Sequence, residues 1–291
     1  MSSIKEEELI NILPKDGPTV EEVKKYLEKY NEEFIVIKCG GSVLVDLNLF
    51  KIFIEDVTVL NKLGFNPIVV HGGGKRINIK LNELNIKSNF INGLRVTDKN
   101  TIKIVEDVLI DFNKEIVAAL KGQSCQTRRI TSKEYNIITV KPESDKLGFV
   151  GTPTHIKVNV LKEIIKVNEI PVIAPLGLDE NNQTFNINAD TVAGAIAKEL
   201  KARRLMIISD VEGVLDKEEK LIPEINSSKA KELINQEVIS GGMIPKINNC
   251  LDVASNGVKG VVIIDGRKNH SLLFELLSDK GSGTLIREWK I

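Results

Sequence analysis

The 291-residue sequence lacks the features that mark proteins of nucleic acids and membranes. Its 40 basic residues balance 40 acidic ones and aromatic residues make up only 4%, which disfavours a nucleic-acid partner. No apolar run approaches the roughly 20 residues that a membrane-spanning helix needs. We therefore predict no nucleic-acid partner and no membrane partner. Any anionic ligand must be held by local groups, because no net charge attracts it.

Cysteine is scarce, and arginine is missing from the start of the chain. The three cysteines, Cys39, Cys125 and Cys250, show no paired spacing, which argues against a disulfide framework and against a metal site. The first 20 residues are acidic and contain no arginine, unlike a secretory signal or an organelle transit peptide. We therefore predict a cytoplasmic protein with reduced thiols.

Apolar runs alternate with amphipathic stretches along most of the chain. The short apolar runs predict strands at 34–38, 67–71, 136–140, 170–177, 204–210 and 260–265. Apolar residues at helical spacing predict helices at 19–33, 49–63, 75–86, 98–120, 190–202, 243–257 and 270–278. Apolar strands separated by helices predict an α/β fold, a three-layer sandwich with a mainly parallel central sheet flanked by helices on both faces.

Three stretches interrupt this alternation. Asn92-Gly93 is a hairpin turn signal within residues 90–98, and residues 147–158 also predict a hairpin. Residues 121–129 are polar and predict an irregular segment. We expect the hairpins to lie outside the central sheet, as lids or insertions.

Two predicted strands end in glycine clusters. Lys38 is followed by Gly40 and Gly41, and the second strand ends at His71 before glycines 72–74. Glycine lets the backbone approach a ligand, and N–H groups that open a helix bind anions. Neither cluster fits the P-loop or the dinucleotide fingerprint. One cluster alone could be only a tight turn, but two at adjacent strand ends indicate an anion site.

Three later stretches extend this pattern, at residues 186–194, 209–216 and 240–246. Each has an alternative interpretation. Asp190 could be only a helix cap, the second stretch only a turn, and Lys246 a solvated helix lysine. Their common position at strand ends facing one crevice favours the anion site instead.

The order of these motifs is specific. The chain contains six motifs in this order: "IKCGGS", "VVHGGG", "NGLRVTD", "NINADTVAG", "SDVEGVLD" and "GGMIPK". With these motifs the chain closely resembles the acetylglutamate kinases of the amino acid kinase family over residues 18–286. The glycine pairs and "GGMIPK" indicate only the wider family, which includes carbamate kinases, aspartokinases and uridylate kinases. "NGLRVTD" and "NINADTVAG" are the motifs that point to acetylglutamate.

The resemblance implies transfer of the γ-phosphoryl group of ATP to the side-chain carboxylate of N-acetyl-L-glutamate, giving N-acetyl-L-glutamyl 5-phosphate in L-arginine biosynthesis. Such an acceptor, with a reference pKa of about 4.3, is already ionised at neutral pH and needs no general base. Catalysis then consists of alignment and charge neutralisation. Mg²⁺ is expected to accompany ATP largely through water, and we predict no protein ligand for it.

The resemblance also implies roles for individual residues. The catalytic residues would be Lys38, Lys246 and Asp190, with the aspartate holding both ammonium groups. The substrate-binding residues would be Gly72, Gly73, Arg95 and Asn186, with Arg95 clamping the α-carboxylate. The nucleotide-binding residues would be Gly40, Gly41, Ser209, Asp210, Gly213, Leu215, Gly242 and Met243. His71 is interpreted as fixing its loop without transferring a proton.

Domain organisation and regulation follow from the same resemblance. Residues 1–31 would be an N-terminal extension and oligomerisation helix, 32–178 an acetylglutamate-binding and dimerisation lobe, and 179–291 an ATP-binding lobe. In the arginine-inhibited branch a helix at this N-terminal position links dimers into a hexamer. An arginine pocket would be lined by Tyr26, Glu275 and Gly281. The alternative is a solvated amphipathic helix with an ordinary surface glutamate, and control by a PII signalling protein stays open.

Two competing functions remain on sequence grounds. The first is a kinase for acetylaminoadipate in lysine biosynthesis, whose extra methylene is worth only about 1–3 kcal/mol of discrimination. The second is a non-catalytic amino acid sensor on the same fold. The presence of Lys38, Asp190 and Lys246 argues against the sensor, because a sensor needs no phosphoryl clamp.

Overall fold

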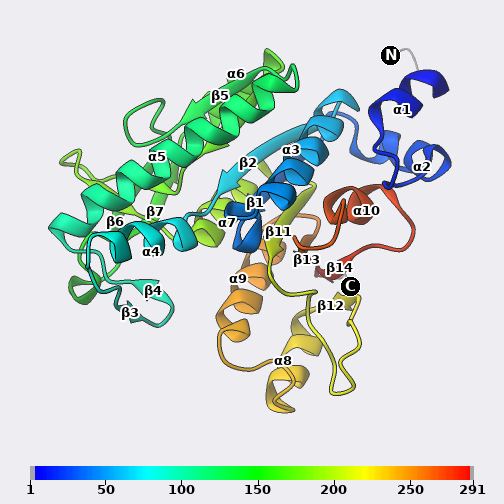
Figure 1. Ribbon diagram of the computed structural model, residues 1–291. Helices are drawn as coiled ribbons and strands as arrows, with labels where there is room; N and C mark the ends of the chain where they lie inside the picture. The colour runs from blue at the N-terminus through cyan, green and yellow to red at the C-terminus, as the bar shows by residue number, and fades with distance from the viewer. Residues whose placement is uncertain (1–3, 289–291) are drawn as a thin grey trace.

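The computed structural model describes residues 4–288, and its central sheet has the strand order β12-β14-β13-β11-β1-β2-β8-β5 (Figure 1). These strands are β1 (Phe34–Cys39), β2 (Asn66–His71), β5 (Thr127–Ile130), β8 (Ile170–Ile173), β11 (Arg204–Ser209), β12 (Glu224–Ile225), β13 (Val261–Asp265) and β14 (Gly283–Ile286). Neighbouring strands pair in parallel except β13 with β14. The prediction of a mainly parallel sheet is confirmed.

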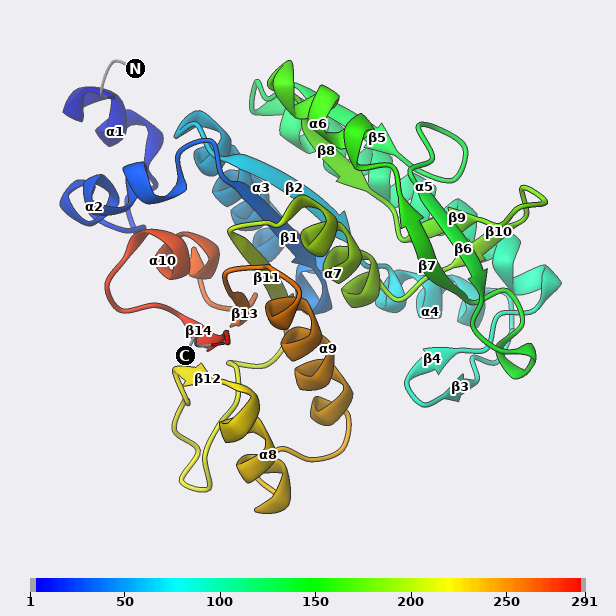
Figure 2. The same cartoon turned by 180° about the vertical axis from the view of Figure 1, so that it is seen from behind.

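Helices cover both faces of this sheet, and the residues of β1 show why. Ile35 and Ile37 point into one core and Val36 into the other, because successive side chains of a strand alternate. The first face is covered by α1 (Glu6–Ile12), α2 (Val20–Tyr30), α3 (Leu47–Lys62), α5 (Lys99–Gly122) and α10 (Ser271–Leu277). The second is covered by α6 (Val158–Lys166), α7 (Ala189–Leu200), α8 (Ser227–Asn235) and α9 (Met243–Ser255). The predicted three-layer sandwich is therefore confirmed (Figure 2).

Smaller elements lie beyond the end of the sheet near α4 (Gly74–Glu83). A second sheet has the order β10-β9-β6-β7, formed by β6 (Ile138–Pro142), β7 (Gly151–Ile156), β9 (Leu176–Leu178) and β10 (Thr184–Asn186). The pair β3 (Phe90–Ile91) and β4 (Leu94–Arg95) forms a separate hairpin. Its turn residues Asn92 and Gly93 have φ of 50° and 81°, the left-handed geometry that the turn signal predicts. Two short 3₁₀ helices, η1 (Gly41–Leu44) and η2 (Asp145–Leu147), complete the list.

Three sequence predictions need correction. The hairpin expected within 147–158 is wrong, because β7 pairs with β6 instead. The single strand expected at 170–177 divides at Ala174-Pro175, and its two halves join different sheets. Residues 121–129 include the start of β5, an edge strand whose side chains are partly polar, as edge strands often are.

The N-terminal part folds against the body of the protein. Helix α2 begins with a capping box, in which Thr19 and Glu22 each satisfy the other's backbone N–H. Val23 and Tyr30 of α2 are buried in the same core as β1. Within residues 4–288, no helix is both long enough and apolar enough to cross a membrane.

Candidate active site

The turns that follow β1 and β2 lie side by side. Cys39 is opposite His71 in the parallel pairing, and the Gly72 N–H donates to the Cys39 carbonyl at 2.8 Å. Gly41 has a φ of 66°, and a Cβ atom there would lie 2.3 Å from Asp210 Oδ1, so only glycine fits. Both glycine clusters therefore open onto the same edge of the sheet.

One carboxylate contacts two lysines at this edge. Asp190, in the first turn of α7, has Oδ1 3.0 Å from Lys38 Nζ and Oδ2 2.9 Å from Lys246 Nζ. Lys38 comes from β1 and Lys246 from the first turn of α9. The cap of α7 is Asn188, whose side chain accepts from the N–H groups of Asp190 and Thr191. The alternative in which Asp190 is only a helix cap is wrong.

The charges in this group are mostly shielded from water. The side chains of Lys38, Asp190 and Lys246 are 12%, 19% and 19% exposed. Burial alone would raise the pKa of Asp190, but the two ammonium groups outweigh it and hold that pKa well below its ordinary value. The Lys38 contact is an ion pair without hydrogen-bond alignment, whereas Lys246 donates a hydrogen bond. Two cations and one anion leave the group with a net positive charge.

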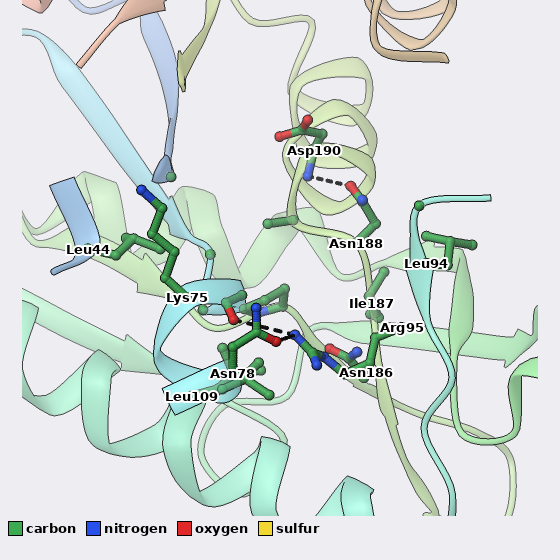
Figure 3. Close-up of a pocket in the computed structure, with 18 of the residues that line it drawn as sticks. Leu44, Lys75, Asn78, Leu94, Arg95, Leu109, Asn186, Ile187, Asn188 and Asp190 are labelled. Carbon is green, nitrogen blue, oxygen red and sulfur yellow. Dashed lines mark hydrogen bonds between the residues drawn. The ribbon is translucent and has the colours of Figure 1, made fainter. Parts of the chain in front are cut away.

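A cavity of about 400 Å³ opens beside the glycine turns (Figure 3). Lys38 and Asp190 line one end of it, and Figure 3 shows Arg95 and Asn186 at the other. All four predicted substrate-binding residues line this cavity: Gly72, Gly73, Arg95 and Asn186. The structure therefore brings together residues that lie more than 100 positions apart in the sequence.

Arg95 is held in the cavity wall by neutral groups. It is 7% exposed, and its guanidinium lies 4.7 Å from the centre of the Phe90 ring. Nη1 donates to Ser88 Oγ at 2.6 Å, and Nη2 donates to Asn78 Oδ1 at 2.7 Å and to the Gly74 carbonyl at 3.4 Å. A guanidinium has five N–H donors, so two remain for a ligand. Within residues 4–288, no carboxylate forms an ion pair with this group.

A second cavity of about 680 Å³ adjoins the first, and the two linings share Gly93, Leu94, Asn188 and Asp190. Its lining includes Gly242 and Lys246 at the start of α9, with Asn92-Gly93 of the hairpin opposite. Asp190 is thus shared by both cavities, with Lys38 on one side and Lys246 on the other. The two ammonium groups therefore lie where the two cavities adjoin.

Several predicted nucleotide-binding residues lie away from these linings. Gly40 and Gly41 line the first cavity and Gly242 the second. The others are absent from both linings, as far as residues 4–288 show: Ser209, Asp210, Gly213, Leu215 and Met243. Gly213 packs against Thr284, where a Cβ atom would lie 2.5 Å from the hydroxyl oxygen. Their nucleotide contacts stay predictions.

Lys75 also lines the first cavity, although it is not among the residues predicted from the sequence. Its Nζ lies 2.8 Å from Asp210 Oδ2 and 3.0 Å from Ser42 Oγ, and Asp210 Oδ1 accepts from the Ser42 N–H at 2.6 Å. This Lys75–Asp210 pair joins α4 to the end of β11. Its signal in the sequence was a lysine directly after the second glycine cluster.

The three residues expected to bind arginine come together elsewhere, between α2 and α10. The Tyr26 hydroxyl donates to Asp279 at 2.7 Å, and this hydrogen bond raises the pKa of Tyr26 to about 12. Glu275 accepts from the Ser282 N–H at 2.6 Å. Gly281 is adjacent, since a Cβ atom there would lie 3.2 Å from Glu275 Oε2. Their role stays a prediction.

The residues that remain for a metal ion are few. Asp190 and Asp210, the carboxylates beside the cleft, are both engaged by lysines. The described part of the chain contains no group of three or more histidine, cysteine or acidic side chains that could hold a metal ion.

Comparisons with known proteins show the family to which the chain belongs. A sequence model of the amino acid kinase family matches residues 33–265. The chain is 82% identical over 288 residues to the acetylglutamate kinase of Pelagibacter ubique, covering 99% of this chain and all of that one. It is 46% identical to the acetylglutamate kinase of Campylobacter fetus, covering 90% of this chain and 94% of that one.

Among solved structures, the N-acetylglutamate synthase of Neisseria gonorrhoeae, complexed with coenzyme A and N-acetyl-glutamate, matches with a TM-score of 0.85. The match covers 93% of this chain and 63% of that longer one at 22% identity, so it supports the fold alone.

The family match and the high identity over nearly the whole chain show a phosphotransferase. The chain belongs to the amino acid kinase family, and within it to the branch of the acetylglutamate kinases.

Proposed function

We propose that this protein transfers the γ-phosphoryl group of ATP to the side-chain carboxylate of N-acetyl-L-glutamate, forming an acyl phosphate for L-arginine biosynthesis. The observation that carries the proposal is the position of Lys38, Asp190 and Lys246 where the two cavities meet. The first cavity takes acetylglutamate and the second takes the phosphates of ATP. High identity to acetylglutamate kinases over the whole chain supports this choice of acceptor.

The mechanism follows from charge. The acceptor carboxylate is ionised at neutral pH, with a reference pKa of about 4.3, so no side chain has to remove a proton. Lys38 and Lys246 neutralise the charge of the transferring group from opposite sides, and Asp190 holds both ammonium groups in place. The two unused N–H groups of Arg95 bind the α-carboxylate of acetylglutamate at the other end of the cavity.

Backbone groups complete the binding of oxygen atoms. The N–H groups of Gly40, Gly41 and Gly73 lie in turns that line the first cavity, where they donate to phosphoryl and carboxylate oxygens. Asn186, in the same lining, hydrogen-bonds the bound acetylglutamate. Ser209, Asp210, Gly213, Leu215, Gly242 and Met243 remain the proposed border of the nucleotide.

We propose Mg²⁺ as the ion that accompanies ATP. The residues present fit an ion carried by the phosphates and water, because the nearby carboxylates of Asp190 and Asp210 already contact lysines. When bound, such an ion neutralises negative charge on the triphosphate.

The cavities also support a division of the chain. Residues 32–178 supply most of the lining of the first cavity, and residues 179–291 most of that of the second. We propose the former as the acetylglutamate-binding lobe, which also makes the dimer contact, and the latter as the ATP-binding lobe.

An assay that traps the acyl phosphate with hydroxylamine tests the reaction. ATP-dependent hydroxamate should form with acetylglutamate, and much less with acetylaminoadipate. A preference for acetylaminoadipate would favour the lysine-biosynthesis kinase. No hydroxamate with either acceptor, together with binding of one of them, would favour an amino acid sensor.

We further propose that L-arginine inhibits the enzyme at the site between α2 and α10. The convergence of Tyr26, Glu275 and Gly281 supports it, because a half-buried carboxylate such as that of Glu275 suits a guanidinium. Helix α2 would then link dimers into a hexamer.

This regulatory proposal is best tested by point variants. Removing residues 1–31 would also strip Leu9, Val23 and Tyr30 from the core, so a loss of inhibition could reflect damage. Glu275→Gln should weaken inhibition by L-arginine at least tenfold while leaving turnover without arginine unchanged. Full inhibition of this variant would contradict the proposed pocket, and sedimentation of the natural protein as a dimer would contradict the hexamer.

A further inference from the structure

A buried asparagine of α5 contacts the turn that carries the predicted substrate glycines. Asn113 is completely buried, and its Nδ2 atom lies 2.9 Å from the Val172 carbonyl and 3.2 Å from His71 Nε2. Its Oδ1 atom has no partner among the described residues. A buried polar group left unpaired is unusual and needs an explanation, because an apolar side chain of similar size would avoid its cost.

The contacts of Asn113 fix which histidine nitrogen carries the proton. The Val172 carbonyl can only accept, so the Asn113 atom facing it must be the NH₂ nitrogen. The same nitrogen faces His71 Nε2 and can only donate to it. His71 Nε2 must therefore accept, which places the ring proton on Nδ1.

The proton on Nδ1 has a definite acceptor. Nδ1 lies 2.9 Å from the carbonyl oxygen of Gly72, so it donates to that oxygen. The ring is held for this contact by Phe112, which meets it edge-on with ring centres 5.2 Å apart. In a trans peptide the N–H points opposite to the C=O, and no peptide bond is cis here. With the Gly72 carbonyl turned toward the buried ring, the Gly73 N–H points away from the ring, and Gly73 itself lines the first cavity.

We propose that Asn113 is a positioning residue for phosphoryl transfer: it selects the Nδ1–H form of His71, which holds the Gly72–Gly73 peptide so that the Gly73 N–H faces the reacting oxygens. The inference rests on the proposed function of the first cavity. Asn113 touches no ligand itself and acts only through His71.

The electrostatics of His71 agree with this role. Burial lowers the pKa of His71 to about 4, and the charged group that faces it, Arg76, acts in the same direction. The hydrogen bond to Gly72 opposes both only in part. The ring is therefore neutral at neutral pH and donates through one nitrogen only.

The first test observes the ring directly. The chain has three histidines, so ¹⁵N spectra of the full-length protein labelled at histidine can be assigned with two variants, His155→Gln at an exposed site and His270→Gln, each of which removes one of the other two sets of signals. The His71 signals should show a protonated Nδ1 and an unprotonated Nε2, unchanged from pH 8 to pH 5. A protonated Nε2 would overturn the proposal, whether or not any variant folds.

The second test uses Asn113→Asp to reverse the direction of the hydrogen bond between residue 113 and His71 Nε2. An ionised aspartate has the same shape as asparagine but cannot donate. His71 must then carry a proton on Nε2. In the neutral ring Nδ1 would face the Gly72 carbonyl without a proton, and turnover at pH 8 to 9 should fall about 10- to 100-fold, below the loss for a removed oxyanion donor. At lower pH the ring becomes doubly protonated, Nδ1–H returns, and turnover should recover.

The control is Ile116→Ala, a buried apolar change on the same helix. It should lower thermal stability and leave the pH profile of turnover with the natural shape. A pH-independent loss in Asn113→Asp would mean that Asn113 is merely structural and would overturn the inference. If the natural protein makes no hydroxamate from acetylglutamate, the proposed function fails, and that result is separate from the histidine spectra.

Discussion

The two ends of the first cavity hold positive charge in different ways. At one end, Lys38 and Lys246 share the carboxylate of Asp190, and all three groups lie within 3.0 Å of a partner. At the other end, the hydrogen bonds and the ring contact of Arg95 within residues 4–288 go to a hydroxyl, an amide, a backbone carbonyl and an aromatic ring. The first end is partly neutralised by the protein itself, whereas the second is not.

This difference indicates a division of labour. A guanidinium with neutral partners and two free N–H groups gains most from a ligand that supplies a fixed negative charge, which is what binding requires. Ammonium groups held by a shared carboxylate keep their geometry while the charge between them changes, which is what transfer requires. The Arg95 end should therefore govern substrate affinity, and the Asp190 end should govern turnover.

The largest effect is expected at the Asp190 end. Asp190→Asn keeps the shape of the side chain but leaves two ammonium groups without their shared anion, so their positions are lost. We expect kcat to fall at least about 10²- to 10³-fold, the scale for loss of one preorganised group, with a much smaller change in the KM for acetylglutamate. Steady-state kinetics with both substrates varied checks this.

Lys246→Met is the control for the excess positive charge that Asp190→Asn leaves in the group. It leaves Lys38 and Asp190 as a one-to-one pair, so the fold should be less disturbed than in Asp190→Asn, while turnover still falls by a similar factor. Near-normal turnover in both variants would show that this end of the cavity does not handle the transferring group.

Most residues at the Asp190 end of the cavity could be predicted from the sequence, because each belongs to a short local motif. Lys38, the glycine pairs and Asp190 each adjoin an apolar strand or open a helix, and parallel strands bring their carboxyl ends to one edge. The order of strands and helices was predictable for the same reason. The edge strand β5 was not, because residues 127–130 read "TRRI" and an edge strand need not be apolar.

The supporting contacts could not be predicted from the sequence. Asn113 is one asparagine in the middle of a long helix, and it meets His71, 42 residues away, only because α5 packs on the sheet. Asn78 in α4 and Ser88 in the loop that follows it both accept hydrogen bonds from Arg95 of the hairpin. Single polar residues in amphipathic helices look like solvated ones until the fold shows what covers them.

An intermediate effect is expected at the Arg95 end. Arg95→Ala removes a charged hydrogen-bonding group worth about 1.5–3 kcal/mol, so the KM for acetylglutamate should rise about 10- to 100-fold. The KM for ATP should hardly change, because we propose that ATP occupies the other cavity. Ser88→Ala, which removes one neutral partner of Arg95, should have a smaller effect in the same direction. An unchanged KM for acetylglutamate in Arg95→Ala would remove this residue from the substrate site.

The smallest effect is expected for the Lys75–Asp210 pair, whose charges are arranged differently from those at either end of the cavity. It resembles the Asp190 end in pairing a lysine with an aspartate, but it has one charge of each sign, and its side chains are 43% and 34% exposed. Solvent and salt screen such a pair, and exposed pairs are typically worth about 0.2–1 kcal/mol. Lys75→Met should therefore change kcat and both KM values by only a few fold, and less still at high salt.

A double-mutant cycle decides whether this pair is part of the transfer machinery. If Lys75 acts only by holding Asp210 against the Ser42 turn, adding Lys75→Met to Asp210→Asn should cause no further change in kcat or in either KM value. If Lys75 instead contacts a phosphate of ATP, Lys75→Met should raise the KM for ATP in both backgrounds by the same factor. If Lys75→Met alone lost as much turnover as Asp190→Asn, the proposed difference between the Lys75–Asp210 pair and the Asp190 end would be wrong. Burial and a shared carboxylate would then not be what separates a group that acts in transfer from a surface ion pair.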